Sequence, residues 1–161
     1  MTRAADTRRW QSKMAYAEIP DAETWRSRER WLQETEESFQ DPRASYLLSA
    51  QGTFLSRDMD LAFCSGAWVA VIIIAHAVID AWLRDTVEGD YKSNSYQLFG
   101  DDHDLQWLRK KRNLLVHVQE DQTTIDEAEL HKIEENYESL EPDARRAVGM
   151  VFRVMYANPG T

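Results

Sequence analysis

Apolar residues recur at helical spacing through most of this chain. Trp25, Leu32 and Phe39 are seven residues apart in a segment that is otherwise rich in charge. A single apolar stripe of this kind is typical of a helix that packs through one face. Asp21 is a suitable N-cap for that helix, and Asp41, which precedes a proline, ends it. The segment 21–41 therefore predicts one amphipathic helix.

A second helix is predicted to open at Pro42, because proline is tolerated in the first turn of a helix, where its missing N–H is not needed. The charged tetrapeptide Arg57–Asp60 predicts a tight connection between this helix and the next one. The apolar positions that continue the helical period are Leu47, Ala50, Phe54 and Leu61, with Leu48 and Leu55 beside them.

The segment Leu61–Val87 is apolar on nearly every side, which is typical of a helix surrounded by other helices. Its most apolar part, Ala67–Leu83, contains His76 and Asp80. At 17 residues it is also shorter than the roughly 20 residues that a membrane span requires. We therefore expect a buried central helix and no association with a membrane.

The remainder of the chain predicts one long loop and three further helices. The loop runs from Gly89 to Asp104, a length unusual enough to suggest a functional role. The helices are expected over Leu105–Gln119, over Thr124–Leu140, where Thr124 and Glu127 form a capping box, and from Pro142 to Asn158. The expected fold is all-α: residues 1–20 form an arm or short helix, and residues 21–161 form a single domain, a bundle of five or six helices.

Composition agrees with a folded helical domain of 161 residues. The hydrophobic content of 43% is too high for disorder, and six Gly and four Pro are too few for the turns of an all-β fold. Cys64 is the one cysteine, so neither an internal disulfide nor a cysteine-based zinc site can form. The N-terminus lacks the apolar stretch of a secretory leader. We expect a cytoplasmic protein.

The formal net charge of −9 argues against a protein that coats nucleic acids, but the charge is unevenly distributed. Residues 105–119 carry four basic side chains and no acidic one, whereas residues 120–145 carry ten acidic and two basic side chains. The basic segment also holds an arginine, an amide and an imidazole. Arginine offers a planar fork to phosphate oxygens, and histidine titrates near neutrality and can move a proton. Arg112, Asn113 and His117 are therefore a suitable set for a phosphodiester. A basic helix with an exposed histidine is also typical of a solvated surface, and both interpretations stay open at this point.

The segment Arg112–His117 resembles the R-x4-H signature of the HEPN superfamily (higher eukaryotes and prokaryotes nucleotide-binding), many of whose members are metal-independent endoribonucleases. The resemblance extends over roughly 42–120, where the acidic turn Asp58–Ala62 precedes the small and aromatic residues Ser65–Ala70 and His76. In members silenced by a partner nucleotidyltransferase, a tyrosine stands two residues after the histidine. This chain has Gln119 there, so control by modification of that tyrosine is not expected.

The resemblance implies a helical bundle that pairs as a two-fold homodimer, with Arg112 and His117 of both protomers at a shared cleft. It implies cleavage of RNA by attack of a 2′-hydroxyl on the adjacent phosphate, which leaves a 2′,3′-cyclic phosphate and requires no cofactor. On this interpretation Arg112, Asn113 and His117 are the catalytic residues. Contacts to flanking phosphates would come from Arg109, Lys110 and Lys111. A toxin or antiviral-defence effector is the implied role, with an antitoxin or another inhibitory or activating protein as a partner. The alternative is a catalytically silent HEPN-like module that dimerises and binds a protein or a nucleotide.

Three other features of the sequence could carry chemistry. The acidic run Asp101–Asp104 includes His103, but adjacent loop side chains rarely converge on one ion, and an acidic helix N-terminus is favoured by the helix dipole. No metal site is therefore expected there. His76 is interpreted as a hydrogen-bonded core residue. Asp80 needs a partner if it is buried, and Arg84 or Arg112 could supply it, so Asp80 is a candidate for supporting the site.

Overall fold

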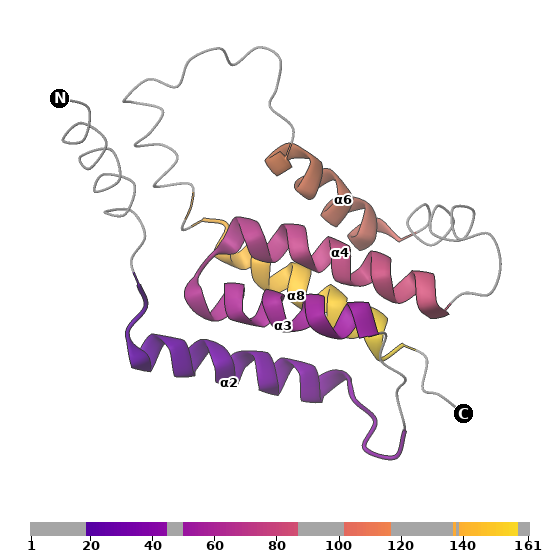
Figure 1. The fold of residues 1–161 in the computed structure, drawn as a ribbon, viewed down its shortest axis with the longest axis horizontal. Helices are drawn as coiled ribbons and strands as arrows, with labels where there is room; N and C mark the ends of the chain where they lie inside the picture. The colour runs from indigo at the N-terminus through magenta and orange to yellow at the C-terminus, as the bar shows by residue number, and fades with distance from the viewer. Residues whose placement is uncertain (1–18, 45–49, 87–101, 117–136, 138, 158–161) are drawn as a thin grey trace, which may run out of the picture.

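The computed structural model describes residues 19–44, 50–86, 102–116, 137 and 139–157. Within these ranges the chain forms five helices and no strand (Figure 1). The expected all-α class is therefore confirmed for the described part of the chain. Most of the predicted arm at 1–20, the loop Gly89–Asp104 up to residue 101, and most of the predicted helix Thr124–Leu140 lie outside it. The helices are α2 (Ala22–Phe39), α3 (Ala50–Ser65), α4 (Trp68–Thr86), α6 (His103–Val116) and α8 (Glu141–Met155).

The start of α2 follows the sequence prediction. Asp21 is the N-cap, and its Oδ1 accepts a hydrogen bond of 2.7 Å from the backbone N–H of Thr24. Leu32, the middle residue of the predicted stripe, is buried, whereas Phe39 at the end of the helix is 37% exposed. Trp25, the first residue of the stripe, is partly buried against the same core, so the stripe packs against the bundle at Trp25 and Leu32 and leaves it at Phe39.

The predicted connection at Arg57–Asp60 is wrong, because α3 continues through these residues without a break. Met59 lies within the charged run and is fully buried, as is Phe63 one turn later, so the helix keeps an apolar face there. The chain turns instead at Gly66, whose φ of 80° lies in the left-handed region that favours glycine. The central helix α4 consequently begins at Trp68 and not at Leu61.

The face that α3 buries also differs from the predicted one. Phe54 is 71% exposed and Leu61 is 49% exposed, although both were expected on the apolar stripe. The predicted stripe is rotated from the buried one because it followed the large apolar residues and treated the charged run as the end of the helix. The buried positions of α3 are Gly52, Met59, Phe63 and Cys64.

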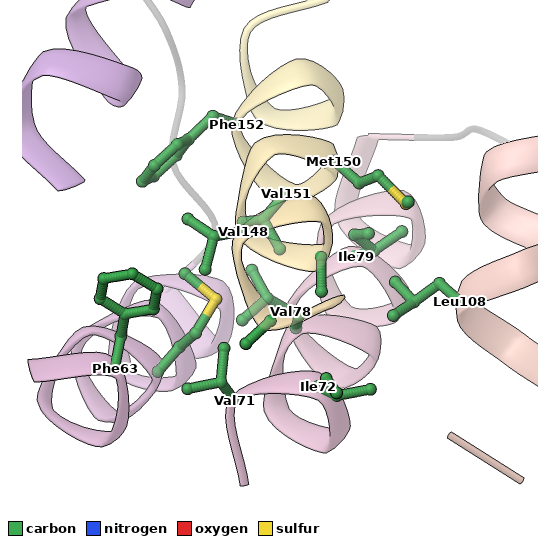
Figure 2. Packing of buried hydrophobic residues seen from close by; sticks show 14 of the residues in the cluster. Phe63, Val71, Ile72, Val78, Ile79, Leu108, Val148, Met150, Val151 and Phe152 are labelled. Atoms are coloured by element: carbon green, nitrogen blue, oxygen red, sulfur yellow. The ribbon is translucent and has the colours of Figure 1, made fainter. Parts of the chain in front are cut away.

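Helix α4 lies at the centre of the bundle and packs against α3, α8 and α6 (Figure 1). Figure 2 shows that Leu108 of α6 points toward the side of α4 that carries Ile72 and Ile79. All three side chains are fully buried. Burial of one such side chain contributes on the order of 1.5–3 kcal/mol. This contact therefore holds α6, the helix that carries most of the predicted motif, against the centre of the fold.

Helix α8 begins with Pro142 in its first turn, as the sequence predicts. It is the most strongly amphipathic of the described helices, and its apolar face lies against α4 (Figure 1). Across the helices that the structure describes, none combines the length and the apolar character needed to cross a membrane. The buried residues of α8 are Ala144, Ala147, Val148, Met150, Val151, Phe152 and Met155.

Candidate functional site

The start of α6 is fixed by Asp102. Its Oδ1 accepts hydrogen bonds from the backbone N–H groups of Asp104, at 2.9 Å, and Leu105, at 3.1 Å. Burial opposes ionisation of this carboxyl, but the Leu105 N–H and the Arg153 guanidinium outweigh it, so the pKa of Asp102 lies below its ordinary value. Asp102 is therefore an ionised cap that sets where the motif helix begins.

Two arginines of α8 hold the same end of α6. Arg153 lies 2.8 Å from Asp102 and 3.5 Å from Asp104, and Arg146 lies 2.6 Å from Asp104. The acidic run thus supplies a helix cap and ion pairs to α8. His103 is exposed, and among the described side chains no three histidine, cysteine or acidic groups gather as metal ligands would. Asp101 lies outside the described residues.

Arg112 lies on the side of α6 that faces α4. At 100° per residue it projects about 20° from Leu105 and about 40° from Leu108, between two buried leucines. The side chain is half-buried, and Nη1 donates a hydrogen bond of 3.0 Å to Oδ1 of Asn113. The sequence placed Arg112 at the border of the apolar arc, whereas the buried leucines place it within that arc. Its guanidinium is thus held at the contact between two helices.

His76 is on the facing side of α4. It lies one turn after Ile72 and within about 60° of Ile79, and Figure 2 shows these two isoleucines beside Leu108 of α6. His76 is half-buried. Burial lowers the pKa of the imidazole below its ordinary value, and the charge of Arg112 lowers it further, as does Arg109, against the opposing effect of Asp80. His76 is therefore a neutral imidazole at pH 7, within electrostatic reach of Arg112.

Asp80 follows His76 by one turn of α4. Its Oδ2 lies 3.4 Å from Nη2 of Arg84, so Arg84, one of its two predicted partners, forms an ion pair with it. The Asp80 side chain is 35% exposed, which is more open than the sequence suggested. Its charge favours protonation of His76 and so opposes the effect of Arg112 on that imidazole.

The three predicted phosphate contacts differ in their surroundings. Arg109 and Lys110 are exposed on α6. The Nζ of Lys111 lies 2.6 Å from Oδ2 of Asp143 on α8, and both side chains are about one third exposed or less. An ion pair of this kind reduces the charge that Lys111 offers to a phosphate. Arg109 and Lys110 are therefore the cations that solvent reaches most freely on this segment.

We use the term α4/α6 seam for the group formed by His76, Asp80, Arg109, Arg112 and Asn113. It combines a guanidinium that can bind phosphate oxygens, an amide bonded to it and a neutral imidazole. His117, the other half of the predicted catalytic pair, lies outside the described residues, as does Gln119. His76 was interpreted from sequence as a core residue. The signal that could have placed it in the site is its position on the same face of α4 as Ile72 and Ile79.

No protein-family model matches the sequence, and no curated protein or solved structure gives a match.

Proposed function

We propose that this protein is a metal-independent endoribonuclease of the HEPN type. The observation that carries the proposal is the position of Arg112, a half-buried guanidinium on the seam side of α6, bonded to Asn113 at 3.0 Å and close enough to His76 to lower the pKa of its imidazole. An arginine that only solubilised the helix would project to solvent. A guanidinium that is partly removed from water can bind a phosphate more strongly than a fully hydrated guanidinium does.

The reaction needs two proton transfers. The 2′-hydroxyl of RNA loses its proton and attacks the adjacent phosphorus, the bond from phosphorus to the 5′-oxygen breaks, and that oxygen takes up a proton. The products are a 2′,3′-cyclic phosphate and a 5′-hydroxyl. Arg112 stabilises the charge that develops on the phosphate, Asn113 orients Arg112, and His117 transfers a proton. Exposed Arg109 and Lys110 bind the flanking phosphates, and the proposal retains Lys111 as a weaker contact.

A two-fold homodimer is part of the proposal, because it would bring Arg112 and His117 of two protomers to one cleft. A toxin or defence effector in the cytoplasm is the role that suits such an activity, with an antitoxin or another regulatory protein as its partner. No cofactor and no metal ion is required by the reaction as written.

Cleavage of a structured RNA in the presence of EDTA tests this function. The wild type is expected to produce fragments with 2′,3′-cyclic phosphate ends, whereas Arg112→Ala and His117→Ala each lose at least about 100-fold in rate, the scale of removing one transition-state contact. Arg57→Ala serves as the matched control, because Arg57 is an exposed cation of α3. Equal cleavage by the wild type and both site variants would refute the proposal.

The catalytically silent module is the second candidate, and an exposed apolar pair on α6 favours it. Leu114 is 61% exposed and Val116 is 43% exposed, and both lie within the segment Arg112–His117. Apolar side chains that a monomer leaves in water often mark a contact with another protein. This candidate predicts that Leu114→Lys abolishes association with a partner or a second copy while no RNA cleavage is detectable in either protein.

A further inference from the structure

A single histidine cannot serve as the base and the acid of one RNA cleavage event at the same time. One imidazole must be neutral to accept the proton of the 2′-hydroxyl, and another must be charged to donate a proton to the leaving 5′-oxygen. The proposed function supplies one imidazole per protomer through His117. The described part of the chain contains a second imidazole beside Arg112.

The second imidazole is that of His76, and the packing of the two helices fixes its place. Ile72 and Ile79 precede and follow His76 on the face of α4 that receives Leu108 of α6 (Figure 2). Arg112 comes one turn after Leu108, on the same face of α6. His76 and Arg112 are both half-buried. Each therefore projects from its helix toward the seam and keeps part of its surface in contact with solvent.

The charged groups around His76 come from both helices. Arg112 and Arg109 of α6 disfavour its protonation, and Asp80 of its own helix favours it, with Arg84 paired to Asp80 at 3.4 Å. The two cations and the burial prevail, so the ring is neutral at pH 7. Neutral imidazole is the form that a general base requires.

We infer that His76 is the proton acceptor of the α4/α6 seam, a catalytic residue in the same protomer as Arg112. This inference rests on the proposed function. A ring nitrogen of His76 takes the proton as the 2′-O–H bond breaks and the bond from the 2′-oxygen to phosphorus forms. The bond from phosphorus to the 5′-oxygen then breaks, and that oxygen receives the proton of the His117 imidazolium. Exchange with water returns both imidazoles to their starting states.

The other charged groups of the α4/α6 seam have roles that differ from that of His76. Asp80 is bound by Arg84 and therefore tunes the base without accepting the proton itself. Arg112 adds its charge to the effect of burial in keeping the base neutral, and it binds the phosphate that the deprotonated 2′-oxygen attacks. The same guanidinium thereby links binding of the phosphate to the protonation state of His76.

The pH dependence of kcat/KM tests the inference. The wild type is expected to show a rise in kcat/KM whose midpoint lies below the ordinary histidine pKa, because the rise reports the neutral fraction of His76 in the free enzyme. His76→Gln is expected to lose about 100-fold or more in rate, the scale of general-base catalysis, and to lose that rise. The matched control is His103→Gln, since His103 is exposed at the first position of α6. It should keep both the rate and the profile.

The outcomes separate this inference from the proposed function. If Arg112→Ala cleaves as fast as the wild type, the proposed function is wrong and the inference fails with it. If Arg112→Ala is inactive but His76→Gln keeps the rate, or loses it uniformly with the acid limb in place, only the role of His76 as a base is wrong.

A second measurement does not depend on the variant folding. The ring signals of His76 and His103 are followed by NMR in the wild type while a 2′-deoxy oligonucleotide, which lacks the attacking hydroxyl, is added to saturation. The His76 ring signals are expected to shift and those of His103 to stay in place. Unchanged His76 signals at saturation would overturn the inference.

Discussion

Asp60 is a mostly buried carboxyl group whose pKa lies far from its ordinary value. Its Oδ1 is buried on α3 without a hydrogen-bond partner. Burial, and then the charge of Glu36 on α2, raise the pKa of the carboxyl from 3.8 to about 7. The hydroxyl of Tyr156 donates to Glu36 and in turn accepts a hydrogen bond of 3.0 Å from Gln40.

This arrangement makes the stability of the fold depend on pH. In the unfolded chain Asp60 ionises near pH 3.8, whereas in the folded protein it stays protonated up to about pH 7. The folded state therefore binds more protons between these values, and its stability falls as the pH rises from about 4 to about 7. Above the folded pKa this contribution is constant, because Asp60 is ionised in both states.

Asp60→Asn is expected to remove the loss of folding stability that accompanies the rise in pH. The variant should match the wild type near pH 4 and exceed it at pH 8 by about 2 kcal/mol in free energy of unfolding, roughly half the linkage limit for a shift of about three pKa units. Urea unfolding at both pH values measures the difference. Asp58→Asn is the control, since Asp58 is exposed two residues away. A gain at pH 4 equal to that at pH 8 would contradict the account.

At the scale of elements, the turn between α3 and α4 fixes the angle at which the central helix leaves its neighbour. Arg28 of α2 reaches across this turn, donates a hydrogen bond of 3.1 Å to the carbonyl of Cys64, and lies 4.7 Å above the ring of Trp68. The hydroxyl of Tyr137 donates to the carbonyl of Gly66 at 3.3 Å. Two side chains from outside α3 and α4, those of Arg28 and Tyr137, thus stabilise this turn.

Gly66→Ala is expected to destabilise the fold, and Gly149→Ala to stabilise it. At Gly66 the backbone is left-handed, and a Cβ would lie 2.9 Å from Nη1 of Arg28, so the cost is about 1–2 kcal/mol or more. At Gly149, within α8, a Cβ meets nothing within 4 Å, so alanine gains about 0.5–1 kcal/mol of helix stability. Thermal unfolding of both variants measures the effects. A Gly66→Ala variant as stable as the wild type would show that the turn does not require glycine.

The helices whose limits the sequence predicted are those with local signals. The Asp21 cap and the proline at the start of α8 act within one turn, and both are where they were expected. The charged run at 57–60 misled the prediction, because charge within a helix reports its exposed face and not its end. Only the packing of α4 and α2 on α3 decides that Met59 is buried and Phe54 is exposed.

The residues of the candidate site also differ in whether a local sequence pattern or only the packing of helices identifies them. Arg112 and Asn113 were found from a local pattern. His76 was not assigned to the site, because its neighbour Arg112 is 36 residues away in the sequence and only the packing of α6 on α4 brings the two together. The ion pair that occupies Lys111 depends in the same way on α8.

At the scale of the whole molecule, the chain has a net charge of −9 but contains one basic segment, residues 105–119. Most of the surface should repel RNA, so the long-range attraction that basic proteins exert is reduced. Binding then depends on a few contacts at Arg109, Lys110 and Arg112. An acidic protein with a small cationic site should bind RNA weakly and in one place.

The salt dependence of RNA binding is expected to be shallow. Three phosphate contacts to single-stranded RNA give a slope of about −2 in a plot of log K against log salt concentration. Lys110→Ala should reduce the magnitude of the slope by about 0.7, the effect of one contact, and Arg57→Ala should leave it unchanged. Fluorescence anisotropy with a labelled oligonucleotide at several salt concentrations measures the slopes. A slope of −5 or steeper would show that binding extends far beyond this site.

The ion pairs between Arg146 and Arg153 of α8 and the acidic cap of α6 also bear on the order in which the protein is made. The ribosome synthesises α6 before α8, so a nascent chain carries Arg112 before the cap of its helix has any arginine partner on α8. Lys111 lacks Asp143 at the same stage. Completion of α8 therefore sets the moment at which the motif helix is secured. Under the proposed function, this order delays a fully built site until synthesis of the helix that holds it has ended.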